Sequence, residues 1–104
     1  NKRALQNVEM TIRVPGIAFA EWGPGDMGMS FGYRNIPSPY PIEMLEARDR
    51  VFIACKAAGV AFLEGASPND VSDSIDQGVR IFSAGSTGEV ADAGRSYTNR
   101  SMPV

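Results

Sequence analysis

The stretch EWGPGDMGMSFGY, residues 21–33, holds the residues of this chain that are best placed to do chemistry. Three of its glycines have the spacing G-x-G-x-x-G, which is the form of a dinucleotide-binding fingerprint. Such a fingerprint needs a helix that begins within it, because the backbone N–H groups must face the pyrophosphate. We expect no helix between these glycines and about Pro41, and Asp26 would place a negative charge inside the phosphate site. The sequence therefore argues against a dinucleotide site.

Asp26 itself indicates a different chemistry. It would lie just past the carboxyl end of a parallel strand, where ligands bind in open α/β sheets and in barrels. Because Gly25 has no side chain, the N–H groups of Gly25 and Asp26 could approach an anionic group closely, while the carboxylate could bind a hard divalent cation. The alternative is that Asp26 caps the turn by bonding to its own backbone. The spacing alone leaves both interpretations open.

The composition limits what the chain does by itself. It has 104 residues, a net charge of -2, one cysteine and no histidine. Acid–base chemistry that needs imidazole must therefore come from residues outside this chain. The charges are spread along the sequence and no apolar run approaches about 20 residues, so we expect neither nucleic acid nor a membrane as a partner. A single cysteine and the lack of a signal-peptide pattern favour a cytoplasmic protein.

Helices and strands alternate around the loop that carries Asp26. The spacing of apolar residues predicts the helices, and short apolar runs bounded by glycine predict the strands. The expected elements, in chain order, are a helix at 2–14, a strand at 17–22, a long loop at 23–41, a helix at 42–58, a strand at 60–64, a helix capped at 67 and ended at 78, a strand at 80–84, a weak helix at 87–96 and a tail at 97–104. This alternation predicts an α/β fold with parallel strands covered by helices.

Three strands alone would leave open sheet edges, and the chain begins with Asn1 in what is already a helical pattern. We therefore expect residues 1–104 to be the C-terminal segment of a single, longer domain. Two side chains have simple structural interpretations. Cys55 is expected to be a small core residue, and Asp70 is expected to be the acid of a capping box that begins at Ser67.

The loop at Asp26 resembles the metal-dependent pyruvate aldolases of the HpcH/HpaI (citrate-lyase-like) family. In that family a strand ends in the loop G-P-x-D-[LM], which is followed by G-Y. Here the loop reads Gly23-Pro24-Gly25-Asp26-Met27, and Gly32-Tyr33 follows. The similarity covers most of residues 1–90, and the supporting matches are VPGI at 14–17, AAG at 57–59 and FSAGS at 82–86.

The resemblance implies a (β/α)₈ TIM barrel, of which this chain supplies about the last three strand–helix units. It implies that Asp26 is a metal ligand and that the N–H groups of Gly25 and Asp26 bind the carboxylate of pyruvate. The cofactor would be a divalent metal, Mg²⁺ or Mn²⁺, with Co²⁺ or Zn²⁺ as alternatives. A second ligand, a glutamate, would lie immediately upstream of Asn1. The catalytic histidine and arginine of the family would also lie upstream, so no catalytic residue is expected here and the chain alone should be inactive.

The activity that this resemblance implies is that of a class II aldolase, a carbon–carbon lyase in which the metal stabilises the enolate of a 2-oxo acid. Substrates of the 4-hydroxy-2-oxo acid type would give pyruvate and an aldehyde. Two alternatives remain open: a CoA-ester lyase of the citryl or malyl type, and a non-catalytic half-barrel that assembles with a complementary chain. The family also implies a homo-oligomer, often a hexamer. Bulky side chains at Trp22 and Met27 leave the acceptor aldehyde open.

Overall fold

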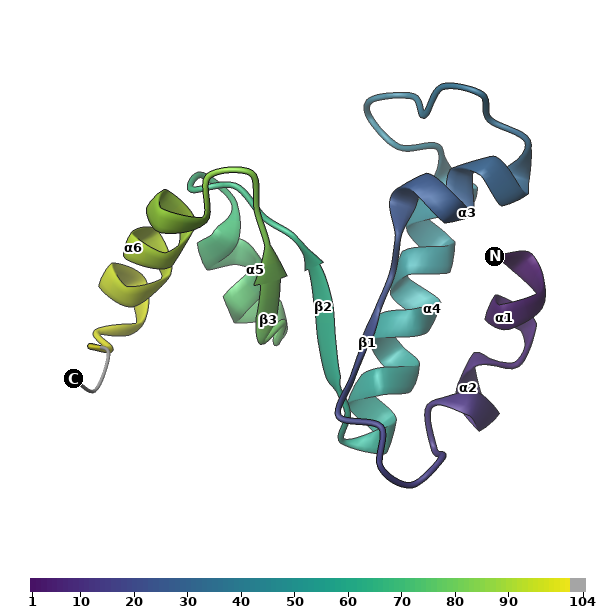
Figure 1. The fold of residues 1–104 in the computed structure, drawn as a ribbon, viewed down its shortest axis with the longest axis horizontal. Coiled ribbons are helices and arrows are strands. Elements are labelled where there is room, and N and C mark those ends of the chain that lie inside the picture. The colour runs from purple at the N-terminus through teal and green to yellow at the C-terminus, as the bar shows by residue number, and fades with distance from the viewer. Residues whose placement is uncertain (102–104) are drawn as a thin grey trace. The chain divides into compact units, whose positions relative to one another are not determined.

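The computed structural model describes residues 1–101 and divides the chain into two compact units, Asn1–Phe62 and Leu63–Val104. The first unit contains α1 (Lys2–Gln6), α2 (Val8–Thr11), β1 (Phe19–Glu21), α3 (Pro24–Phe31) and α4 (Ile42–Ala58) (Figure 1). Strand β2 (Ala61–Gly65) passes from the first unit into the second, which continues with α5 (Val71–Gln77), β3 (Ile81–Ser83) and α6 (Thr87–Thr98). None of the helices in the described residues is long and apolar enough to cross a membrane.

The strands form a sheet in the order β1-β2-β3. Strands β2 and β3 are parallel, with Leu63 opposite Ile81 and Gly65 opposite Ser83. Beside β1, the Ala61 N–H donates to the carbonyl oxygen of Ala18 at 3.3 Å. The α/β class with parallel strands is confirmed. The described strands form an open sheet, so the closed barrel stays a prediction.

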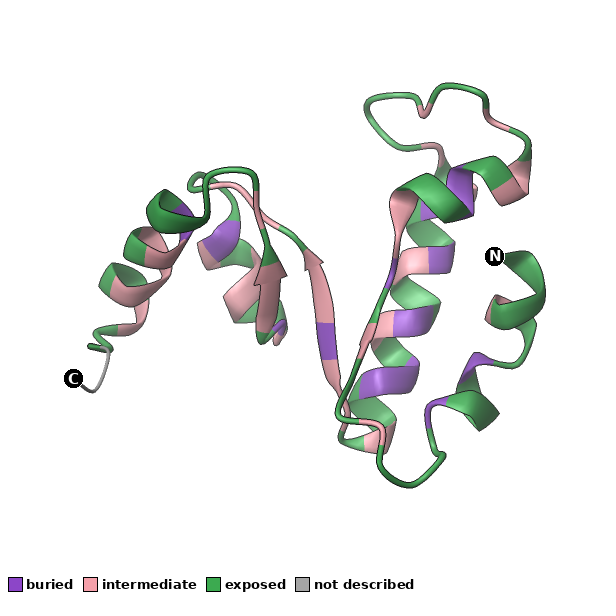
Figure 2. Cartoon of the chain, in the orientation of Figure 1, coloured by how far each residue is buried: buried purple, intermediate pink, exposed green. Residues whose placement is uncertain are grey.

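Helix α4 organises the first unit, and its predicted bounds are confirmed. One face is buried along its whole length, as the purple bands in Figure 2 show, and it carries Met44, Ala47, Val51, Ala54 and Cys55. Gly59 ends the helix in the left-handed conformation, with φ 68°, and its N–H bonds to the carbonyl of Lys56. Cys55 is completely buried, as expected for a core residue.

The single helix predicted at 2–14 is wrong, because the chain breaks it at Asn7. This residue has φ -112° and ψ 11°, and its side-chain Nδ2 donates to the carbonyl oxygen of Arg3 at 3.2 Å. An asparagine side chain that bonds to nearby backbone offers the chain an alternative to the helical ladder, which accounts for the break. The result is two short helices, α1 and α2, instead of one continuous helix.

The loop predicted at 23–41 is also wrong in its first half, where the chain forms the helix α3. Gly23 is its N-cap in an extended conformation, and Pro24 occupies the first turn, where its missing N–H costs nothing. Gly32 ends the helix in the left-handed conformation, with φ 98°. A Cβ on Gly28 would lie 2.9 Å from the side chain of Ile36, so the glycine permits a close approach between α3 and the following loop.

In the second unit, α5 and α6 pack against each other around the buried side chains of Val71, Val79 and Val90. The carboxylate of Asp70 accepts from the Ser67 N–H at 2.6 Å, which is one of the two bonds of the predicted capping box. Helix α5 itself begins later than predicted, at Val71, and Asp70 is its N-cap. Gly78 ends α5 as predicted, with φ 110°.

The tail predicted from residue 97 is wrong at its start, because α6 continues to Thr98. The Tyr97 hydroxyl donates to Asp76 at 2.6 Å, which ties the last turn of α6 to α5. Asn99 then ends the helix in the left-handed conformation, with φ 53°. The rest of the predicted tail, residues 102–104, lies outside the described residues.

Candidate metal and substrate site

The candidate site forms where β1 passes into α3. The strand ends at Glu21, and the first hydrogen bond within the helix runs from the Met27 N–H to the Gly23 carbonyl at 3.0 Å. The N–H groups of Gly25 and Asp26 precede that bond, so helical geometry gives them no acceptor inside α3. They lie at the positive end of the helix, where an anion is stabilised. The structure therefore brings together the donors that the sequence predicted.

The side chain of Asp26 lies in the same first turn and is exposed. Its Oδ2 is 3.8 Å from the point that a Cβ on Gly23 would occupy, so the carboxylate folds back toward the start of the helix. A Cβ on Gly25 would meet nothing within 4 Å. The N-terminal turn of α3 is therefore open to a ligand on the side that carries both residues.

Helix α3 starts earlier than the sequence predicts. The glycine motif and the residues up to about Pro41 are predicted to be a loop, and α3 in fact begins at Pro24, inside the glycine motif. The strand–turn–helix context of a fingerprint is thus partly present. The negative charge of Asp26, within the first turn, remains the physical reason why a pyrophosphate is disfavoured there.

A cavity of about 220 Å³ adjoins this turn in the first unit. Asp26 and Glu21 line it together with apolar side chains from the short helices, among them Leu5, Val8 and Ile12. Its position beside β1 means that the carboxylate of Asp26 has an apolar neighbourhood on one side and solvent on the other. This cavity could not be predicted from the sequence, because it depends on how α1 packs against α3 and α4 and how α2 packs against α4.

Trp22 joins the strand to the turn and is 5% exposed. Its ring packs edge-on against Tyr40, with centroids 5.7 Å apart and planes at 78°. Within the described residues its Nε1 has no hydrogen-bond partner. The packing fixes the end of β1, and so the start of α3, against the loop that precedes α4.

A second contact holds the far end of α3. The Tyr33 hydroxyl donates to the carboxylate of Glu43 in the first turn of α4. This hydrogen bond raises the pKa of Tyr33 above its usual value and lowers the pKa of Glu43. The sequence does not reveal this contact, since the two side chains meet only because the intervening loop returns to α4.

The donor set at Asp26 fits one part of a site for a hard divalent cation. Within residues 1–101, no group of three His, Cys, Asp or Glu side chains is close enough to hold a metal ion. Magnesium sites often use only one or two carboxylates and complete their octahedron with water and substrate oxygens. The exposed carboxylate of Asp26 therefore fits as one protein ligand of such a site, and it cannot form one alone.

A protein-family model for HpcH/HpaI aldolase/citrate lyase matches residues 1–93 of the chain. No curated protein and no solved structure matches it significantly. The chain belongs to the HpcH/HpaI aldolase/citrate lyase family, which confirms the resemblance carried by the G-P-x-D loop. The family is one of lyases and aldolases, and its members generally use a divalent metal.

Proposed function

We propose that this chain contributes part of the substrate and metal site of a class II, metal-dependent aldolase that cleaves or forms a C–C bond of a 2-oxo acid. The observation that carries the proposal is the start of α3 at Pro24, directly after β1. It puts two free N–H donors and one carboxylate in a single helical turn. That combination suits a ligand set made of a substrate carboxylate and a divalent cation.

Each residue of the turn has a distinct role in this proposal. The N–H groups of Gly25 and Asp26 donate to the carboxylate of the 2-oxo acid and fix its orientation. The Asp26 carboxylate binds Mg²⁺ or Mn²⁺, with Co²⁺ or Zn²⁺ as alternatives. When bound, the cation supplies a Lewis acid for the developing enolate charge. Its positive charge also offsets the repulsion between Asp26 and the substrate carboxylate.

In this proposal the chain's own residues bind and orient the substrate and the cation, and none of them moves a proton. There is no histidine in the sequence, and the Asp26 carboxylate is assigned to the cation. The acid–base groups would come from outside residues 1–104, as the family resemblance implies. We accordingly expect the 104-residue chain to be inactive by itself and to form part of a larger, homo-oligomeric enzyme.

The test is Mn²⁺ binding to the enzyme that contains this chain, measured by electron paramagnetic resonance in wild type and in Asp26→Asn. We expect Mn²⁺ to bind at least about tenfold more weakly in the variant, since a carboxylate ligand has been replaced by a neutral amide. Asp73→Asn, in the first turn of α5, is the matched control and should bind Mn²⁺ like wild type. Equal affinity in Asp26→Asn and wild type would refute the proposed metal ligand.

The family description also includes citrate lyase, which supports a second candidate, a CoA-ester lyase of the citryl or malyl type. The G-P-x-D loop resembles the aldolases, and for this reason we place the aldolase first. Assays with a 4-hydroxy-2-oxo acid and with malyl-CoA or citryl-CoA distinguish the two. If the enzyme cleaved the CoA esters and not the 4-hydroxy-2-oxo acid, the CoA-ester lyase would replace the aldolase as the proposed function.

A further inference from the structure

Glu21 is the last residue of β1, and it is exposed directly before the turn that carries Gly25 and Asp26. The carboxyl end of a parallel strand is where ligands bind in open α/β sheets and in barrels. Glu21 therefore lies at the end of the strand at which the proposed substrate and metal site forms. The roles assigned above to Gly25 and Asp26 leave this second carboxylate without a function.

Two observations place Glu21 in the surroundings of Asp26. Both residues line the cavity of about 220 Å³ in the first unit. Only the buried Trp22 and the N-cap Gly23 separate Glu21 from the first turn of α3. The packing of Trp22 against Tyr40 therefore fixes the end of β1 and the start of α3 together. The two carboxylates thus share one region of the first unit.

The charges in this region favour a substrate with one carboxylate over a substrate with two. In the proposed site, a divalent cation offsets the charge of Asp26 and the charge of the substrate carboxylate that the N–H groups bind. Among the residues that the structure describes, none forms a hydrogen bond or an ion pair with Glu21, and no lysine or arginine lines the cavity. A second substrate carboxylate in this region would therefore meet the charge of Glu21.

We propose that Glu21 is a specificity-determining residue, which disfavours 2-oxo acids with a second carboxylate and so selects those whose aldehyde portion is uncharged. The inference rests on the function proposed for the first turn of α3 and names the class of substrate for that site. Repulsion between like charges is a common way in which a site rejects the wrong ligand. A 4-hydroxy-2-oxopentanoate, which gives pyruvate and acetaldehyde, fits the site. A 4-hydroxy-2-oxoglutarate, which gives pyruvate and the anion glyoxylate, is disfavoured.

The test compares how two ligands of equal carbon number bind to the Mn²⁺-loaded enzyme that contains this chain. One end of 2-oxopentanoate is a methyl group, and the corresponding end of 2-oxoglutarate is a second carboxylate. The ratio of their dissociation constants, measured by calorimetry, reports the cost of the second charge. We expect Glu21→Gln to shift this ratio at least about fivefold in favour of 2-oxoglutarate, because one negative charge is removed from the site.

Salt and two further variants separate the charge of Glu21 from its contribution to packing. The difference between wild type and Glu21→Gln should shrink between about 0.1 M and about 1 M salt, since ions screen exposed charges. Glu21→Asp keeps the charge and should keep the wild-type ratio. Glu46→Gln makes the same chemical change on the exposed surface of α4, away from the cavity, and is the matched control. An equal shift in Glu46→Gln, or a shift in Glu21→Gln that salt does not reduce, would overturn the proposal.

Mn²⁺ binding distinguishes a failure of this inference from a failure of the proposed function. By electron paramagnetic resonance, Glu21→Gln should bind Mn²⁺ like wild type, with circular dichroism confirming its fold. If Glu21→Gln lost Mn²⁺ as Asp26→Asn is expected to, Glu21 would be a metal ligand and its role in specificity would be wrong. If both acids bound to wild type and the ratio stayed unchanged in Glu21→Gln, the role of Glu21 alone would be refuted. If neither acid bound to wild type, the proposed substrate site would be refuted together with the role of Glu21.

Discussion

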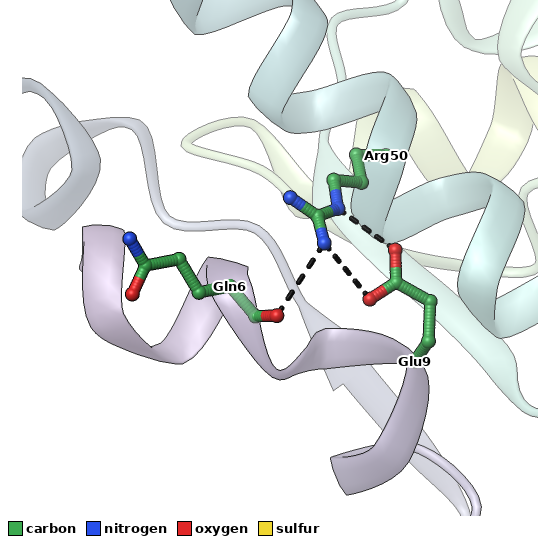
Figure 3. Close-up of polar contacts among 3 residues, drawn as sticks. All are labelled: Gln6, Glu9 and Arg50. Atoms are coloured by element: carbon green, nitrogen blue, oxygen red, sulfur yellow. Dashed lines mark hydrogen bonds and ion pairs between the residues drawn. The ribbon is translucent and has the colours of Figure 1, made fainter.

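Arg50 in α4 holds Glu9 in α2 through two parallel contacts, Nε to Oε1 at 2.8 Å and Nη2 to Oε2 at 3.0 Å (Figure 3). The same Nη2 also reaches the carbonyl of Gln6 at 3.4 Å. A planar guanidinium that meets a carboxylate in this way has a defined geometry as well as a favourable charge. The pair therefore fixes both short N-terminal helices, which line the cavity beside Asp26, to the long helix of the first unit.

The hydrogen bond from Arg50 lowers the pKa of Glu9 from 4.5 to about 2. A lowered folded-state pKa stabilises the fold above the unfolded value and loses that contribution as the pH falls from about 4.5 to about 2. We therefore expect the free energy of unfolding of Glu9→Gln, measured by urea titration, to change less with pH in this window than that of wild type. Both side chains are largely exposed, so solvent screening keeps the effect small. If the free energy of unfolding of Glu9→Gln fell with pH as steeply as that of wild type, the ion pair would not persist in solution.

Gly28 and Gly25 make a matched pair for testing how α3 packs. A Cβ on Gly28 would meet Ile36 at 2.9 Å and Met44 at 3.6 Å, so we expect Gly28→Ala to lower the free energy of unfolding by about 1–3 kcal/mol. Gly25→Ala has open space and a helical backbone, and should raise it by up to about 1 kcal/mol. Chemical denaturation of the two variants provides the comparison.

We expect the two glycine substitutions to change the free energy of unfolding in opposite directions. If Gly28→Ala were as stable as wild type, the close packing of α3 against the loop before α4 would be wrong. Gly25→Ala keeps its backbone N–H, so the proposed carboxylate donor survives in that variant. A loss of substrate binding there would show that the ligand approaches through the space that the new methyl group fills.

The Tyr33–Glu43 contact predicts that the phenol of Tyr33 loses its proton at a higher pH than an ordinary tyrosine. The hydrogen bond to Glu43 raises the pKa of Tyr33 above 10.0. Because the folded-state value is the higher one, its contribution to stability is complete below pH 10.0 and is lost as the pH rises through the folded pKa. The ultraviolet difference between wild type and Tyr33→Phe should therefore show a phenolate midpoint above pH 10.0. A midpoint at or below that value would mean that the hydroxyl does not bond to Glu43.

Cys55 should react with thiol reagents only when the protein unfolds. The residue is completely buried in α4, and burial raises the pKa of its thiol, so both access and thiolate content are reduced. Addition of a disulfide reagent to the native chain should give at least about a hundredfold slower reaction than in denaturant. Fast reaction of the native protein would show that the face of α4 around Met44 and Val51 opens readily.

The parts of the fold that were predictable are those in which local signals agree. In α4, the apolar spacing, Pro41 before the helix and Gly59 after it all indicate the same bounds. Helix α3 was missed because glycine and proline together usually indicate a loop, whereas here Pro24 occupies a position that tolerates it. The break at Asn7 was missed because it depends on one side-chain hydrogen bond, which apolar spacing does not report.

The candidate site also has features that the sequence predicts and features that it does not. The position of Gly25 and Asp26 just after a strand was predictable, because a short apolar run bounded by glycine precedes them. The contact of Trp22 with Tyr40 was not, since the two residues are separated by α3 and a loop whose path the sequence does not determine. The family model supports the class of chemistry, and the roles of the individual residues stay predictions until the variants are measured.

Pro24 in the first turn of α3 has a consequence for which anions the turn prefers. Proline has no N–H, so this helix offers one donor fewer than an ordinary N-terminus, and the next two positions supply the donors that remain. A carboxylate presents two oxygens in one plane and can be matched by two donors. In the proposed site, the two N–H groups of Gly25 and Asp26 therefore match the two oxygens of a substrate carboxylate, and the position of a single imino acid sets that number of donors within the first turn.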